Sequence, residues 1–195
     1  MPNRPTVVRT NSTSNSLKAV QLKAVTFQEL WDNYPDGNPY DNPAYPDQCA
    51  IRMSVAFHRV GVDMKSFSSK LVKPLSGQPS IGRILLDGEV TATRANELGE
   101  WLKLQPFAGL GKAENITGAN WVSKVKDRAG VIMFDGYWTR DGESQGNASG
   151  GHIDLWNGEK LTGFGTGVRV SWNIVIPGIW SDFRSSRAIL FFPIK

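Results

Sequence analysis

Residues 46–54 read Pro-Asp-Gln-Cys-Ala-Ile-Arg-Met-Ser, and they place the only cysteine of the 195-residue chain, Cys49, at the start of a predicted helix. Asp47 is the predicted N-cap, and apolar residues follow at close to helical spacing as far as Gly61, the predicted C-cap. The first turn of a helix stabilises an anion through its unpaired N–H groups and the positive end of its dipole. This position therefore favours a Cys49 thiolate, the nucleophilic form of cysteine.

The chain has two histidines that can act as a base for this thiolate, and their positions differ. His58 lies on the same predicted helix as Cys49, near its opposite side and more than two turns away. His152 lies in the alternating segment 150–158, which ends in an Asn-Gly pair and is typical of a strand entering a tight hairpin. Side chains two apart share a strand face, so His152 and Asp154 are expected to point the same way.

Composition narrows the class of protein. With 40% hydrophobic residues, the chain is long enough to bury the core of one domain, and a single cysteine excludes an intramolecular disulfide. The net charge of +4 suits an anionic partner, but the scattered lysines and arginines argue against nucleic acid. Neither a cleavable signal nor a membrane-spanning segment is evident, so any export is expected to use a route without such a signal.

The order of the predicted elements indicates an α+β fold, with helices first and an antiparallel sheet after them. Residues 1–24, rich in Ser, Thr and Asn, are predicted to be a flexible arm, and residues 25–195 a single domain. Helices are predicted after Thr26, from Cys49, at 64–72, at 91–104 and from Thr117, and strands at 130–135, from 150, at 160–164, 168–176 and 188–192.

Three blocks of the sequence carry a resemblance to a known family. They are Phe27, Leu30 and Trp31 through Pro35, then Cys49–Ser54, then Gly151–Gly158. On these blocks, which span roughly residues 26–195, the chain resembles the fourth family of type VI secretion amidase effectors. These are peptidoglycan amidases related to the papain-like NlpC/P60 group. The resemblance implies a papain-like fold with N-terminal helices packed on a C-terminal antiparallel sheet, and the arm before Thr26 looks like an addition to the family pattern.

The resemblance also implies a function. The enzyme would cut the amide between D-glutamate and diaminopimelate in the peptide stems of a rival bacterium's wall. It would be made in the cytoplasm without a cleavable signal and delivered by the type VI secretion machinery to the target-cell periplasm. A cognate periplasmic immunity protein is the expected inhibitor. No metal or other cofactor, no nucleic acid and no membrane insertion are expected.

Within this scheme Cys49 is the nucleophile and His152 the base that later protonates the leaving amine. Asp154 is the first choice for the group that orients the imidazole, although two positions along a strand span about 6.5 to 7 Å. A two-residue turn at the Asn-Gly pair would place His152 opposite Gly163, which has no side chain to offer. Asn173, on a later predicted strand, is the alternative.

Tyr34, Arg52 and Trp156 are the predicted substrate-binding residues. Tyr34 is a candidate contributor to the oxyanion site, beside the Cys49 backbone N–H. Arg52, one turn from Cys49, suits a forked pair with a substrate carboxylate, and the alternative is an ordinary charge on the helix face.

Two other functions fit the same residues. A cysteine peptidase acting on protein would use the same Cys49 and His152. A non-catalytic wall-binding module would use Trp31, Trp138 and Trp156 as a platform, with Cys49 merely buried.

Overall fold

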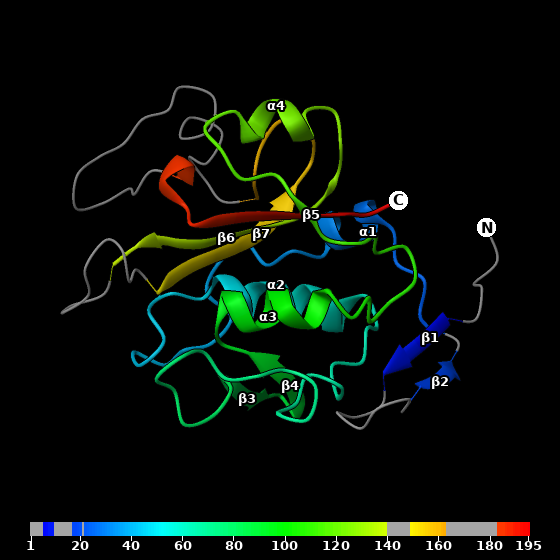
Figure 1. Cartoon of the computed structure of the whole chain (residues 1–195). Helices are drawn as coiled ribbons and strands as arrows, with labels where there is room; N and C mark the ends of the chain where they lie inside the picture. Colours follow the sequence, from blue (N-terminus) through cyan, green and yellow to red (C-terminus); the bar gives the residue numbers. More distant parts are fainter. Residues whose placement is uncertain (1–5, 10–16, 21, 140–148, 163–182) are drawn as a thin grey trace.

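The computed structural model describes residues 6–9, 17–20, 22–139, 149–162 and 183–195. The central feature is a four-stranded antiparallel sheet with the strand order β5-β8-β6-β7 (Figure 1). Its strands are β5 (Glu114–Asn115), β6 (Gly130–Trp138), β7 (Gly150–Trp156) and β8 (Ala188–Pro193). The helices are α1 (Phe27–Asp32), α2 (Cys49–Arg59), α3 (Ala95–Leu102), α4 (Trp121–Val125) and the 3-10 helix η2 (Phe183–Ser185).

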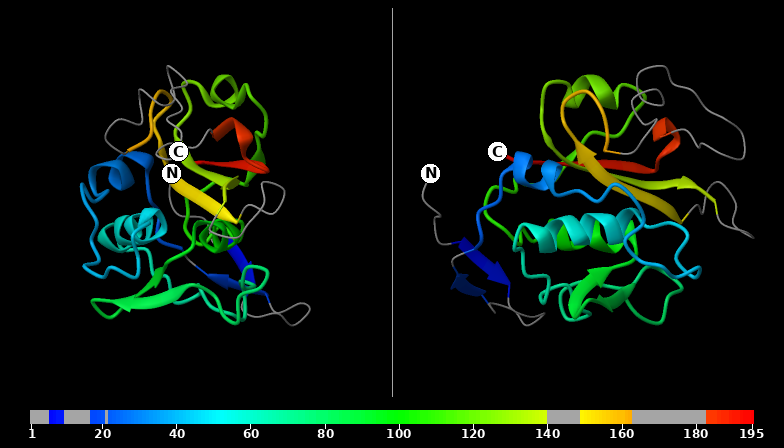
Figure 2. Two further views of the ribbon diagram at one scale, coloured as in Figure 1. Left: turned by 90° about the vertical axis from the view of Figure 1, so that its left-hand side faces the viewer. Right: turned by 180° about the vertical axis from the view of Figure 1, so that it is seen from behind.

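Helices cover both faces of this sheet, as the views in Figures 1 and 2 show, with α2 and α3 on one side and α4 on the other. The cause is visible in the alternation along β6. Val131 and Met133 belong to the core formed with α2 and α3, whereas Ile132 and Phe134 belong to the core formed with α4. Burial of both faces stabilises the sheet through two separate hydrophobic clusters. The predicted α+β arrangement, with earlier helices packed on a later antiparallel sheet, is confirmed.

Helix α2 begins at Cys49, as predicted, but Asp47 does not cap it. The N-cap is Gln48, whose side chain makes no capping hydrogen bond. Its amide instead holds the preceding loop by donating to the Tyr40 and Tyr45 carbonyls, at 2.6 and 3.0 Å, and by accepting from the Tyr40 N–H at 3.1 Å. The prediction for Asp47 is wrong because the buried Gln48 ties the helix start to that loop.

A hairpin that was not predicted from the sequence lies between α2 and α3. Strand β3 (Arg83–Leu86) pairs with β4 (Glu89–Ala92) across Asp87 and Gly88, whose φ angles are 52° and 83°. Two positive φ values in a two-residue loop are the mark of a type I′ turn, for which Asp-Gly is a favoured pair. Because Thr91 and Ala92 pair in β4, the predicted helix 91–104 starts only at Ala95.

The other helix predictions have mixed outcomes. Helix α4 confirms the helix predicted after Thr117, and α1 begins after the predicted cap Thr26, whose side chain forms a capping box with Glu29. Residues 64–72 form turns rather than the predicted helix. Met64, Phe67 and Val72 are nevertheless buried, so their spacing reflects a loop anchored in the core.

The turn after β7 differs from the predicted two-residue hairpin. The Asn157 side chain accepts hydrogen bonds from the Glu159 and Lys160 N–H groups, and the Asn157 N–H donates to the Lys160 carbonyl. These bonds close a longer loop, so that Trp156 bridges to Leu161 instead of Glu159. Of the strand predicted at 160–164, the described residues 160–162 form only the bridge at Leu161. The rest of that strand and the strand predicted at 168–176, with Asn173, lie outside the described residues.

In the predicted flexible arm, β1 (Thr6–Arg9) pairs antiparallel with β2 (Leu17–Val20). These paired segments depart from the prediction, and the β-branched run Thr-Val-Val in β1 favours the strand. Among the residues that the structure describes, no helix combines the length and apolar character needed to span a bilayer.

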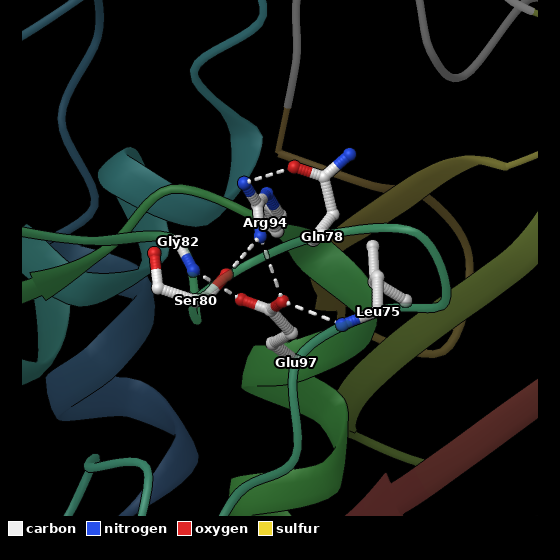
Figure 3. A network of polar contacts seen from close by, with 6 residues as sticks. All are labelled: Leu75, Gln78, Ser80, Gly82, Arg94 and Glu97. Carbon is white, nitrogen blue, oxygen red and sulfur yellow. Dashed lines mark hydrogen bonds and ion pairs between the residues drawn. The ribbon is translucent and has the colours of Figure 1, made fainter.

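A buried carboxylate fixes the loop before the β3–β4 hairpin on α3 (Figure 3). Glu97 accepts hydrogen bonds from the Leu75 and Gly82 N–H groups and from Arg94, all within 3.0 Å. Arg94 in turn donates to the Ser80 carbonyl and to the Gln78 side chain. This network is satisfied internally and has a structural role.

Candidate active site

The Cys49 side chain lies where the start of α2 meets strand β7, which puts the predicted nucleophile beside the predicted base. Cys49 is half-buried. Its thiol forms a hydrogen bond with the His152 imidazole and accepts another from the Ile153 backbone N–H. The helix start and the strand therefore converge on the sulfur atom from two sides.

The imidazole of His152 is held in a fixed plane. Its Nε2 atom lies 3.4 Å from Oδ2 of Asp154, and its side chain is 16% exposed. The ring stacks with those of Phe134 and Phe183, with centroids 6.3 and 5.7 Å away. Because Nε2 is directed toward Asp154, Nδ1 is the nitrogen left for the thiol.

The Asp154 carboxylate is buried, with 2% of its side chain exposed, and its two oxygens have different partners. Oδ1 accepts hydrogen bonds from the Leu155 N–H, at 2.8 Å, and from the Thr162 hydroxyl. Oδ2 faces His152. This division of partners sets the orientation of the carboxylate toward the imidazole.

The electrostatics of the pair favour a thiolate and an imidazolium. Burial alone raises the pKa of the Cys49 thiol, but the hydrogen bond and charge of His152, with the Ile153 N–H, bring that pKa below its ordinary value. Burial alone lowers the pKa of His152, whereas the hydrogen bonds and charges of Asp154 and Cys49 raise it to about 9. At a pH between the lowered pKa of Cys49 and the raised pKa of His152, both groups are charged, and this ion pair suits nucleophilic catalysis.

Tyr34 and Arg52, the predicted substrate-binding residues, lie beside the site. The Arg52 guanidinium lies over the Tyr34 ring, 5.9 Å from its centroid. Burial, with the negative charge of Asp154, raises the pKa of Tyr34 well above its ordinary value. The Arg52 Nε is buried without a hydrogen-bond partner among the described residues, and such an atom is a candidate for contact with a ligand. The Tyr34 hydroxyl is buried beside the Thr162 side chain.

A family model for type VI secretion system amidase effector protein 4, named Tae4, matches residues 45–192 of this chain. The match covers the helix of Cys49 and the strands of the central sheet. The chain belongs to the Tae4 family. This is a family of type VI secretion effectors that are peptidoglycan amidases, and the resemblance found in the sequence is thereby confirmed.

Solved Tae4 structures share the fold. The effector Tae4 from Enterobacter cloacae is 14% identical, with a TM-score of 0.53, and the alignment covers 89% of this chain and 99% of that one. The Tae4/Tai4 effector–immunity system from Salmonella typhimurium gives 16% identity and a TM-score of 0.52, covering 87% and 97%. Among curated proteins no sequence matches this chain.

Two other predicted assignments have clear outcomes in this Tae4-family chain. Trp156 is fully buried, donates from Nε1 to the Val125 carbonyl at 2.8 Å and packs edge-on against Trp121. The prediction of Trp156 as a substrate contact is therefore wrong. His58 contacts the Val90 carbonyl at 2.9 Å, which supports its exclusion as the base. The described residues contain no group of three or more His, Cys, Asp or Glu side chains that can hold a metal.

Three groups of this Tae4 site were not predicted from the sequence: Thr162, Phe183 and the Ile153 N–H. The signal for Thr162 was Asn157, because an Asx turn there lengthens the loop and returns Thr162 beside Asp154. The Ile153 N–H reaches Cys49 only because α2 packs against β7, a tertiary contact that the local sequence does not indicate. No sequence signal links Phe183 to His152, since thirty residues separate them and the contact depends on the sheet.

Proposed function

We propose that this Tae4-family chain is a cysteine amidase that hydrolyses the bond between D-glutamate and diaminopimelate in peptidoglycan peptide stems. The observation that carries the proposal is the contact between the Cys49 thiol and the His152 imidazole, with Asp154 at the other nitrogen of the ring. A cysteine at a helix start that meets a histidine on an antiparallel strand is also the arrangement of papain-like NlpC/P60 enzymes. The fold is therefore proposed to belong to that group.

The reaction begins with attack of the Cys49 sulfur on the amide carbonyl carbon. The new carbon–sulfur bond forms as the carbonyl oxygen takes up negative charge, and the backbone N–H of Cys49 donates to that oxygen. This N–H belongs to the first residue of α2, so it has no acceptor within the helix. The carbon–nitrogen bond then breaks, and His152 gives its proton to the departing amine.

A water molecule completes the cycle. His152, now neutral, takes a proton from the water as the oxygen attacks the acyl carbon, and the carbon–sulfur bond breaks. The products are a free carboxylate on the D-glutamate side and a free amine on the diaminopimelate side. Asp154 keeps Nε2 oriented and stabilises the imidazolium that precedes each turnover.

Arg52 and Tyr34 are proposed to bind the substrate beside this centre. Peptide stems carry free carboxylates next to the scissile amide, and a guanidinium with a buried, unpaired Nε suits a forked pair with such a group. The Tyr34 ring makes a cation–π contact with the Arg52 guanidinium.

Delivery and inhibition follow from the family. The chain is proposed to be carried by the type VI machinery and to act on the target-cell periplasmic wall. A solved Enterobacter cloacae relative is a complex of Tae4 with Tai4, named there as an effector–immunity pair. A cognate immunity protein is proposed here, and the net charge of +4 suits an acidic inhibitor.

The test compares substrates and a nucleophile variant. Purified peptidoglycan fragments and casein are incubated with the wild-type chain and with Cys49→Ala, and newly formed primary amines are measured. Amine release from peptidoglycan alone, lost in Cys49→Ala, supports the proposal. Release from casein would favour the peptidase alternative. Wall binding with no amine release from either substrate would favour the binding module.

A further inference from the structure

Thr162 holds one oxygen of the Asp154 carboxylate, outside the set of residues assigned to the reaction. Its hydroxyl donates to Oδ1, which also accepts from the Leu155 N–H at 2.8 Å. The other oxygen, Oδ2, lies 3.4 Å from Nε2 of His152. A carboxylate with both acceptor directions of one oxygen filled in this way has little freedom to rotate about its last bond.

The loop after β7 brings Thr162 to this position. Asn157 closes the loop through its side chain, and the bridge between Trp156 and Leu161 returns the chain beside the strand. Thr162 follows directly after the bridge. Its place near Asp154 is therefore fixed by backbone hydrogen bonds that do not involve the hydroxyl, so removal of the hydroxyl leaves the loop intact.

Tyr34 lies beside the contact between Thr162 and Asp154. Its buried hydroxyl lies beside Thr162 and close to Asp154 and Cys49. Because the Tyr34 hydroxyl and the Asp154 side chain are both buried, water has restricted access to the space that a lost hydroxyl would leave. Among the described residues, the Leu155 N–H would then be the remaining partner of this carboxylate oxygen.

We propose that Thr162 is a positioning residue of the amidase, which fixes the Asp154 carboxylate so that Oδ2 faces the His152 imidazole. The inference rests on the proposed function and adds a residue to it. Thr162 touches neither Cys49 nor the scissile bond in this scheme. Its effect passes through Asp154, and it should therefore change the turnover step and the titration of the imidazole rather than substrate affinity.

The main variant is Thr162→Val, which keeps the shape of the side chain and removes the hydroxyl. Thr162→Ser keeps the hydroxyl. Thr91→Val is a matched control, because it removes a hydroxyl from another buried threonine, one that donates to the Glu89 carbonyl. We expect kcat of Thr162→Val to fall about ten- to a hundredfold, the range for one hydrogen bond to a charged group, with KM unchanged. Thr162→Ser should stay within about threefold of wild type.

A second readout needs no wall substrate. The rate of Cys49 alkylation by iodoacetamide is measured against pH for each variant. A loosened carboxylate stabilises the imidazolium less, so the upper titration of the thiol–imidazole pair should move to lower pH in Thr162→Val, by about 0.5 to 1 unit. Thr162→Ser and Thr91→Val should keep the wild-type profile.

The outcomes separate this inference from the proposed function. Wild-type rates and profile in a folded Thr162→Val would overturn the role of Thr162 and leave the amidase intact. An inactive wild type with a shifted Thr162→Val alkylation profile would overturn the amidase proposal and leave the positioning role. If Thr162→Val unfolds, Thr162→Ala against Thr162→Ser decides, since equal kcat and profile in that pair contradict the inference.

Discussion

The Nε2 atom of His152 lies 3.4 Å from Oδ2 of Asp154, although the two residues are two positions apart on strand β7. Side chains at this spacing share a face of the strand, and here they lean together across the distance that separates their backbone positions. An orienting carboxylate therefore need not come from a neighbouring strand. The geometry supports the proposed role of Asp154 and gives it a direct test.

Asp154→Asn should retain an acceptor for the Leu155 N–H and lose the negative charge opposite the imidazole. We expect kcat to fall by about 10²- to 10⁴-fold, because the imidazole loses both its orientation and the charge that stabilises its protonated form. Steady-state kinetics on peptidoglycan fragments measures the loss, and thermal unfolding checks that the variant folds. A folded Asp154→Asn with wild-type turnover would exclude Asp154 as the orienting group.

The pH dependence follows from the paired shifts of Cys49 and His152. The pKa of Cys49 is below its ordinary value, so the thiolate persists to lower pH than an ordinary thiolate and is lost as the pH falls through that lowered value. The pKa of His152 is raised to about 9, so the imidazolium that protonates the leaving amine is lost as the pH rises through about 9. We expect a bell-shaped profile of kcat/KM between these limits.

Iodoacetamide labelling provides the matching chemical measurement on the free enzyme. Modification of Cys49 should already be rapid near pH 6, and His152→Ala should slow it by removing the positive partner. Labelling of the wild type that becomes appreciable only above about pH 8, as for an ordinary thiol, would rule out the ion pair.

Arg52→Gln tests the proposed contact with a substrate carboxylate. Loss of a charged hydrogen bond should raise KM about ten- to a hundredfold while kcat changes little. Arg59→Gln is the control, since Arg59 is an exposed residue on the last turn of the same helix and donates to the Asn33 carbonyl. If both substitutions leave KM unchanged, Arg52 is an ordinary charge on the helix face.

Gly151→Ala should destabilise the strand that carries His152. A Cβ atom at Gly151 would lie 1.9 Å from Oδ1 of Asn96. The Asn96 amide is held by a hydrogen bond to Asp135, which is itself bound by Arg187 at 2.9 Å, so the amide has little room to withdraw. We expect a loss of about 1–3 kcal/mol in the free energy of unfolding, measured with urea.

Gly37→Ala is the matched control for this substitution, because an added Cβ there meets nothing within 4 Å. A Gly151→Ala protein as stable as Gly37→Ala would show that the strand can shift at this point. Its kcat would then report whether His152 moves with it.

The sequence predicted those parts of the fold and site that depend on local pattern. Cys49 at a helix start, alternation along 150–156 and the burial of 130–135 each follow from a short stretch of residues. The β3–β4 hairpin also has a local signal, because Asp87-Gly88 between strand-forming residues is a favoured pair for a tight turn.

Other features required the assembled chain. Trp156 alternates onto the same strand face as His152, yet α4 and the carbonyl of Val125 cover it, and nothing near Trp156 in the sequence indicates that cover. Asp47 has the right residue type for a helix cap, but Gln48 bonds to the loop and sets the start of α2 instead. In both cases tertiary packing overrode a sound local preference.

The Cys49–His152 pair is proposed to cut one particular amide in the wall. Mass spectrometry of purified muropeptides after digestion, with Cys49→Ala digested in parallel, identifies the bond that is cut. We expect fragments whose masses place the cut between D-glutamate and diaminopimelate, formed by the wild type and absent with the variant. Intact muropeptides after wild-type digestion, a cut at another bond, or the same fragments from Cys49→Ala would contradict this proposal.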